Sequence, residues 1–296
     1  LTRTLFLKSN VNLHLHFGAE LLGSTDLDSY HKVFPELKGK ESPALIFARG
    51  VANIAITGSG TINGQSAHQN FQHGNDSKGG PRRPKIIYFI GCNNVRVQDV
   101  TLRNSAYWTQ DYEKCNGVIV RGVKVYSHAN WNNDGLDIDS RNVVVSDCYI
   151  DCDDDALCLK SDTDTPCENV TVTNCVLKSN CNAIKFGTSS YSGFKNVTIS
   201  NCTIDRASED HIRQWYKNYP WIGTKHKTVV AGIALESVDG GIIENVSISD
   251  IAMQGVQTPI FVRLGDRKRT FSKQMSRIND VMISRIIARS EGKIAC

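Results

Sequence analysis

Acidic side chains are concentrated in one short stretch of a chain that is otherwise net positive. Eight aspartates lie from Asp134 to Asp155, and Arg141 is the only basic residue among them, although the whole chain carries a net charge of +4. Crowded carboxyl groups acquire different pKa values, because burial and like charges favour the protonated form of some of them. One residue type can then supply both the acid and the base of general acid/base catalysis.

The strongest candidates in this stretch are Asp134, Asp154 and Asp155, which stand just before two strand-like segments. If those segments are neighbouring strands about 4.8 Å apart, the three carboxyl groups lie together on one surface. Two other roles stay open for aspartates, since they bond to the backbone in tight turns and their oxygens are ligands for Ca²⁺. A turn role is expected for Asp147, Asp151 and Asp153.

The elements that must position these acids follow a repeat. Three Asn-Val segments begin at Asn142, Asn169 and Asn196, so that successive copies are 27 residues apart. Looser copies begin at Asn53, Asn94, Gly117, Asn245 and Asp280. Apolar and polar residues alternate within each copy, which is the period of a half-buried strand. Such a unit buries its apolar face only by stacking on similar neighbours.

This repeat predicts an all-β fold, a right-handed parallel β-helix with coils of about 27 residues, in a single domain over residues 1–296. A β-sandwich is the alternative, but antiparallel pairing does not require the same residue at the same place in every coil. The chain begins at Leu1 without a methionine and ends at Cys296 without a polar tail. We therefore expect a fragment of a longer chain, truncated at both ends.

Three cysteines recur at the repeat period, at Cys148, Cys175 and Cys202. Free cysteine behaves as a small buried hydrophobe, so we expect a stacked ladder of thiols inside the helix rather than disulfides or a metal site. Disulfide partners stay open among Cys152, Cys158, Cys167 and Cys181.

A second set of strands lies between the Asn-Val segments. Its apolar residues align in two columns, which we expect to point into the core: Leu136, Leu157, Ile184 and Ile233, and Ile138, Leu159, Phe186 and Leu235. Side chains alternate across a strand, so the intervening residues must face outward: Asp137, Asp139, Cys158, Lys160, Lys185, Ala234 and Glu236. One external face therefore collects charged side chains beside the three acids.

Two motifs contain the candidate acids. Asn-x-Asp-Gly-x-Asp-Ile spans Asn132 to Ile138, and the pair Asp154-Asp155 follows about 20 residues later, before Leu-Cys-Leu-Lys-Ser. These motifs resemble glycoside hydrolase family 28, which contains the polygalacturonases and rhamnogalacturonan hydrolases. The resemblance extends to residues 6–13, 54–65 and 104–109, and thus over nearly the whole chain.

The resemblance implies hydrolysis of a glycosidic bond with inversion at the anomeric carbon. By residue match, Asp154 is the general acid, while Asp134 and Asp155 hold and deprotonate the attacking water. Inverting enzymes separate acid and base by roughly 6.5–9.5 Å. Stacking places Asp134 nearer to Asp155 than that, so the base role suits those two jointly. This mechanism uses no metal ion and no other cofactor.

Two departures from the family pattern concern the sugar. The family's Gly-His-Gly falls near residues 180–182, where Cys181 stands, and its Arg-Ile-Lys falls at 234–236, where Ala234 and Glu236 stand. In the pectin hydrolases that Arg and Lys hold sugar carboxylates, for which an acidic residue is no substitute. Lys160 and Lys185 are candidates to replace them from neighbouring coils. Galacturonan and rhamnogalacturonan are therefore equal candidates for the substrate.

Further substrate-binding residues are expected around the acids. This set contains Asn132, Asp137, Lys160, Lys185, His128, Trp108 and Arg263. Trp108, like Trp131 and Tyr191, offers a flat face for a sugar ring. The segment 205–228 lengthens one repeat by 22 residues, which predicts a loop that walls the substrate groove.

Composition and charge exclude other partners. A surplus of 34 basic over 30 acidic residues is too small to indicate nucleic acid, and no run of 18 uncharged apolar residues indicates a membrane span. We expect a monomer that acts on a polysaccharide or oligosaccharide. Because such polymers lie outside the cytoplasm, we expect a secreted or periplasmic location, although no signal peptide is visible.

Two other function classes stay open for a solenoid of this kind. A β-helical polysaccharide lyase would need Ca²⁺ and a basic residue that abstracts a proton. A non-catalytic carbohydrate-binding solenoid would need aromatic grooves but no group of carboxylates.

Overall fold

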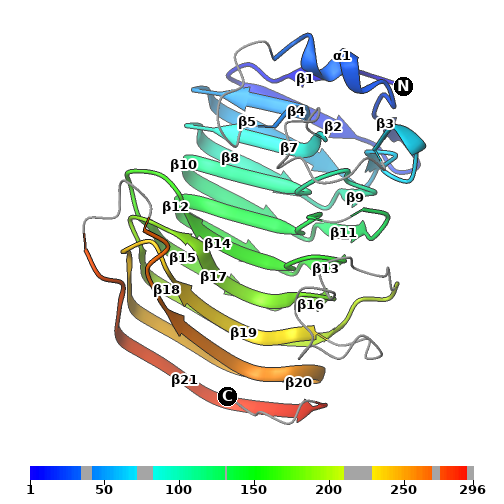
Figure 1. Ribbon diagram of the computed structural model, residues 1–296. Helices are drawn as coiled ribbons and strands as arrows, with labels where there is room; N and C mark the ends of the chain where they lie inside the picture. The colour runs from blue at the N-terminus through cyan, green and yellow to red at the C-terminus, as the bar shows by residue number, and fades with distance from the viewer. Residues whose placement is uncertain (35–41, 72–82, 131, 210–228, 269–273, 292–296) are drawn as a thin grey trace.

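The alternating apolar pattern produces strands that stack as successive coils, from the N-terminal end in blue to the C-terminal end in red (Figure 1). The computed structural model describes residues 1–34, 42–71, 83–130, 132–209, 229–268 and 274–291. Among these residues, 21 strands form one continuous sheet in which the paired strands run parallel. The prediction of a parallel β-helix is confirmed. The extra loop expected at 205–228 lies mostly outside the described residues, as does Trp131.

The coils present three faces. Face A consists of β1 (Leu5–Phe6), β4 (Ala44–Arg49), β7 (Lys85–Ile90), the first parts of β10 (Gln110–Arg121) and β12 (Leu136–Ser146), β14 (Leu157–Ser161), β17 (Asn182–Ser190), β19 (Val229–Ser237) and the last part of β20 (Ile242–Leu264). Face B consists of β2 (Val11–Leu15), β5 (Ala52–Gly58), β8 (Asn93–Gln98), the later parts of β10 and β12, β15 (Cys167–Thr173), and the first parts of β18 (Phe194–Arg206), β20 and β21 (Arg277–Ser290).

Face C closes each coil. It consists of β3 (Glu20–Leu22), β6 (Thr61–Asn63), β9 (Thr101–Arg103), β11 (Lys124–Ser127), β13 (Tyr149–Cys152), β16 (Val176–Ser179) and the later parts of β18, β20 and β21. Helical structure in the described residues is confined to α1 (Leu27–His31) and the 3-10 helix η1 (Gln69–Phe71). No helix in this described part is long and apolar enough to cross a membrane.

The core forms as the alternation predicts. Leu136 is in register with Leu157, then with Ile184 and Ile233 on the following coils, and the second predicted column from Ile138 to Leu235 is in register as well. All eight side chains are buried. Full burial of one such side chain is worth about 1.5–3 kcal/mol, so each coil gains stability from the coil on either side of it.

The recurring asparagine has a conformational role at the corner between faces A and B. Asn142, Asn169 and Asn196 have φ values of 56°, 56° and 53°, in the left-handed region that Asn tolerates better than most residues. Their side-chain amides also form a ladder, because Asn169 donates to Asn142 and Asn196 donates to Asn169, each over 3.0 Å. This ladder aligns the coils and therefore the residues on the other faces.

The three cysteines of the repeat are thiols, as predicted, and the four cysteines left open as disulfide partners are thiols as well. Cys148, Cys175 and Cys202 are buried in the core and stack in one ladder, each donating its S–H to the carbonyl oxygen two residues earlier. None of the nine cysteines in the described ranges forms a disulfide. Burial in a continuous apolar core thus takes the place of covalent links.

Candidate active site

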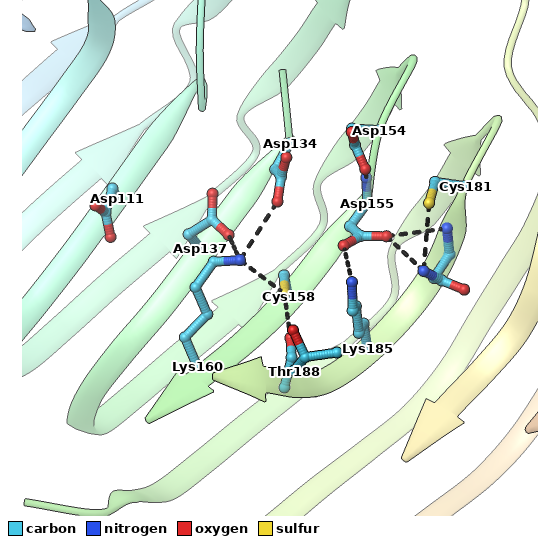
Figure 2. Close-up of polar contacts among 12 residues, drawn as sticks. Asp111, Asp134, Asp137, Asp154, Asp155, Cys158, Lys160, Cys181, Lys185 and Thr188 are labelled. Carbon is cyan, nitrogen blue, oxygen red and sulfur yellow. Dashed lines mark hydrogen bonds and ion pairs between the residues drawn. The ribbon is translucent and has the colours of Figure 1, made fainter. Parts of the chain in front are cut away.

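The three candidate acids lie at one corner of two adjacent coils, where the chain turns from face C to face A (Figure 2). Asp134 precedes β12, and Asp154 and Asp155 precede β14. The backbone N–H of Gly135 donates to the carbonyl oxygen of Asp155 over 2.9 Å, which ties the two turns together. A β-carbon on Gly135 would lie 2.3 Å from Cγ2 of Ile150, so only glycine fits between Asp134 and the core.

Asp155 is held in its ionised form. Its Oδ2 lies 2.7 Å from Lys185 Nζ, and its Oδ1 accepts hydrogen bonds from the backbone N–H and the side-chain amide of Asn182 over 3.1 and 2.7 Å. Burial opposes ionisation of this group, but the positive charges of Lys185 and Lys160 outweigh it and lower the pKa of Asp155 to about 2. This carboxylate is therefore ionised at neutral pH.

Asp134 has the opposite electrostatic environment. Burial, followed by the negative charges of Asp137 and Asp154, raises its pKa well above the usual value, and Lys160 Nζ at 3.5 Å from Oδ2 only partly compensates. The protonated form of Asp134 is thus favoured beside an ionised Asp155. Neighbouring carboxyl groups with pKa values displaced in opposite directions are the arrangement that acid/base chemistry requires.

Asp154 is the most accessible of the three acids. It is 9% exposed, against 3% for Asp134 and 2% for Asp155. Its Oδ1 accepts a hydrogen bond from the backbone N–H of Asp155 over 2.9 Å, which fixes its orientation. The corner is less open than the expected trough, because the side chains of the chain itself cover Asp134 and Asp155.

A second ion pair stands beside the acids on face A. Asp137 is fully buried, and its Oδ1 lies 3.0 Å from Lys160 Nζ. Burial raises the pKa of Asp137 to about 7, against the opposing effect of Lys160. The same Nζ lies 4.2 Å from the centre of the Trp108 ring, a cation–π contact. Trp108 therefore lies against the lysine that contacts Asp134 and Asp137.

Sequence reasoning missed one pair that extends this network. Lys85 Nζ lies 2.5 Å from Asp111 Oδ2 and 4.5 Å from the Trp108 ring centre, and both charged residues are buried. Neither residue belongs to a motif. The position of Asp111 in the repeat could have indicated this pair, because Asp111 is in register with Asp137 on the next coil.

Other predicted residues lie apart from the acids. His128 is buried on the side of face C, with Nε2 2.8 Å from Asp151 Oδ1. Asp151, expected to serve a turn, instead pairs with this histidine and accepts a hydrogen bond from the backbone N–H of Ser208. Arg263 is exposed on β20, in register with Glu236. The described contacts therefore do not link His128 or Arg263 to the three acids.

The positions that depart from the family pattern surround Lys185. Cys181 presents its sulfur within 4.8 Å of a carboxylate oxygen of both Asp154 and Asp155. Ala234 is in register with Lys185, and Glu236 lies two residues further along β19. Burial raises the pKa of Glu236, partly offset by Lys185.

Calcium is a poor match for this corner. Two groups of donors approach one another within 4.8 Å, namely Asp134 with Asp137 and Cys158, and Asp154 with Asp155 and Cys181. Each contains a thiol, whereas Ca²⁺ takes six to eight oxygen ligands. Lysine ammonium groups also lie against carboxylates of both groups. The donor chemistry suits protein–protein ion pairs better than a hard cation.

The structure is thus a parallel β-helix with three carboxyl groups gathered at one corner of its coils. The model of glycosyl hydrolases family 28 matches residues 21–295. The chain belongs to this family.

The following three relatives share at most 31% of the aligned residues with this chain. A probable polygalacturonase of Vitis vinifera is 31% identical over 177 residues, which cover 55% of this chain and 35% of the grape protein. The family 28 exopolygalacturonase of Yersinia enterocolitica has a TM-score of 0.74 at 22% identity, over 98% of this chain and 58% of that one. PfbA, a surface adhesin of Streptococcus pneumoniae, has a TM-score of 0.63 at 14% identity, over 98% and 69% of the two chains. The chain thus spans about a third of its grape relative, and the two structural likenesses concern the fold.

Proposed function

We propose that this protein hydrolyses glycosidic bonds of a pectin-type polysaccharide by an inverting acid/base mechanism. The observation that carries the proposal is that two adjacent coils bring Asp134 and the pair Asp154-Asp155 to one corner, where the backbone N–H of Gly135 bonds to the carbonyl oxygen of Asp155. Membership of glycosyl hydrolases family 28 supports the same reaction class.

In this mechanism Asp154 protonates the leaving oxygen, because it is the most accessible of the three acids. Asp155, kept ionised by Lys185, removes a proton from the attacking water. Asp134 retains its proton and orients that water through a hydrogen bond. The two steps occur on opposite sides of the sugar ring, so the configuration at the anomeric carbon inverts.

The charges around the acids favour a neutral sugar at the cleaved bond. Lys160 lies against Asp134 and Asp137, and Lys185 lies against Asp155, so both ammonium groups already serve carboxylates of the protein. Their expected use as ligands for a sugar carboxylate is therefore unfavourable, and Glu236 adds a further acid nearby. A backbone containing rhamnose, as in rhamnogalacturonan, fits this environment better than a pure galacturonan.

We propose further that one chain acts alone and outside the cytoplasm. The extracellular location follows from the substrate, because polymeric pectin lies outside the cytoplasm.

The test replaces Asp154 by the isosteric Asn. Loss of a general acid lowers kcat by about 10²–10⁴-fold, measured as reducing ends released from rhamnogalacturonan. The loss should be smaller on a substrate with a good leaving group, which needs no protonation, whereas Asp155→Asn should impair both substrates. Asp153→Asn is the matched control, since Asp153 accepts a hydrogen bond from Asn180 at 2.9 Å and has no assigned catalytic role.

Product chemistry separates this function from the alternatives. Hydrolysis yields saturated ends and persists in the presence of a chelator, whereas a lyase yields unsaturated ends that absorb ultraviolet light and needs its cation. A non-catalytic binding solenoid would release no product. Unchanged turnover in Asp154→Asn would exclude the proposed role of that residue.

A further inference from the structure

A cavity of about 430 Å³ lies at the opposite ends of the strands that carry the site. It is lined by Asp164, Pro166, Tyr191, Ser192, Asp239, Gly240 and Gln274. The acids precede face A at the start of β12 and β14, whereas most of these residues lie in the turns that follow β14, β17 and β19. From Asp155 to the end of β14 the chain advances about 20 Å. The cavity is therefore separate from the catalytic corner.

Hydrogen bonds between successive turns hold the cavity in shape. Ser192 donates its hydroxyl to the carbonyl oxygen of Thr163 over 2.7 Å, which joins the first two turns. The backbone N–H of Ser190 donates to Asp239 Oδ2 over 3.2 Å, and the N–H of Asp239 donates back to Ser190 Oγ over 3.0 Å, which joins the second and third turns. Sites for small molecules are commonly preformed and have volumes of about 300–1,000 Å³.

The acidic side chains of the lining are each paired with a basic side chain of the protein. Asp239 is fully buried, and Arg267 donates through Nε to its Oδ1 over 2.7 Å, so this carboxylate and guanidinium neutralise each other. Asp164 is exposed at the rim, and its hydrogen bond with Lys114 lowers its pKa, so this carboxylate is ionised and paired with the lysine. An uncharged ligand rich in hydroxyl groups can bond to these oxygens without repulsion.

The lining also contains an aromatic surface. Tyr191 is half-buried and lines the cavity. An aromatic side chain with one polar end suits a ligand with both apolar C–H and hydroxyl groups. Arg267 joins this wall to the catalytic face, because it donates to both the hydroxyl and the carbonyl oxygen of Thr188, which Figure 2 places near Cys158.

We propose that this cavity is an accessory subsite for a neutral saccharide unit, such as a neutral side branch of the polymer. The inference rests on the proposed function for the source of the ligand, but binding can be measured without turnover. Because the cavity lies about 20 Å from the acids, it affects substrate affinity and not the chemical step.

The binding experiment uses Asp154→Asn protein and titrates in neutral galacto-oligosaccharides, with oligogalacturonides as the anionic comparison. Adding Tyr191→Ala should weaken binding of the neutral ligand about tenfold, while Tyr191→Phe should retain it. Tyr126→Ala, at an aromatic pair on face C, is the matched control. If Tyr191→Ala does not fold, the same titration with Gln274→Ala tests the cavity, because Gln274 is exposed in its lining.

A kinetic experiment distinguishes a branch from a free sugar. In otherwise wild-type protein, Tyr191→Ala should raise KM for branched polymer about tenfold and leave kcat and the debranched substrate unchanged. An effect on free oligosaccharide alone would assign the cavity to free sugars instead. The proposal is overturned if the protein does not bind the neutral oligosaccharide. It is also overturned if the affinity for that ligand is the same in the parent protein, in Tyr191→Ala and in Gln274→Ala. Tyr191-dependent binding, together with an absence of turnover in the wild-type protein, would instead refute the proposed function alone.

Discussion

Replacement of Lys185 by Met tests the electrostatics of the site most directly. Lys185 Nζ lies 2.7 Å from Asp155 Oδ2, and the two side chains are 16% and 3% exposed. The pKa of Asp155 is lowered from 3.8 to about 2, a difference of 1.8, which corresponds to about 2 kcal/mol. Without the lysine, Asp155 keeps the hydrogen bonds from Asn182 and the more distant charge of Lys160 but loses its direct ion pair in a buried site, so we expect a total loss of about 3–5 kcal/mol in the free energy of unfolding.

The effect of Lys185→Met on the free energy of unfolding should depend on pH in a definite direction. In the wild type, the pKa of Asp155 is lower in the folded protein than in the unfolded chain, so its ionisation stabilises the fold above about pH 4, and this is lost as pH falls towards 2. In Lys185→Met the pKa of Asp155 is raised instead, so ionisation destabilises the fold near neutral pH. The stability difference between the two proteins should therefore shrink as pH is lowered from about 7 to about 4.

Urea unfolding at several pH values measures this difference, and the pH profile of kcat/KM should show its acidic limb moved to higher pH. Lys195→Met is the matched control, because Lys195 forms an exposed pair with Glu244 at 3.0 Å, worth less than about 1 kcal/mol. Asp155→Asn combined with Lys185→Met should recover part of the stability. A loss no larger than that of the control, or a difference independent of pH, would refute this account of Asp155.

Three further predictions concern the coils. Gly135→Ala should lower the free energy of unfolding by about 1–3 kcal/mol, because its β-carbon would lie 2.3 Å from Ile150 Cγ2; an unchanged denaturation midpoint would contradict this. Asn169→Ala should cost about 1–2 kcal/mol through its φ of 56° and its lost ladder bonds, and calorimetry should show Asn169→Gly to be the milder change. In a Cys296→Ser background, a thiol reagent should label Cys181 first, since the other described cysteines are buried; prior labelling of another thiol would exclude this.

Much of the fold was predictable because the same residue types recur at a fixed spacing along the sequence. The 27-residue spacing from Asn142 to Asn169 and Asn196 sets which residues stack, and the register of Leu136 with Leu157 follows from it. The approach of Asp134 to Asp155 was predictable for the same reason. In stacked coils, residues that are one repeat apart in the sequence lie next to each other in space.

The sequence by itself thus determined the coil, the inward columns and the corner where the acids meet. Only the tertiary structure decided which charges pair: Lys185 with Asp155, Lys85 with Asp111, and His128 with Asp151. The physical reason is that periodicity places Cα atoms, whereas the side chains reach to the neighbouring coil and pair there according to burial and charge. The same limit applies to the cavity beside Tyr191, which exists only where three turns come together.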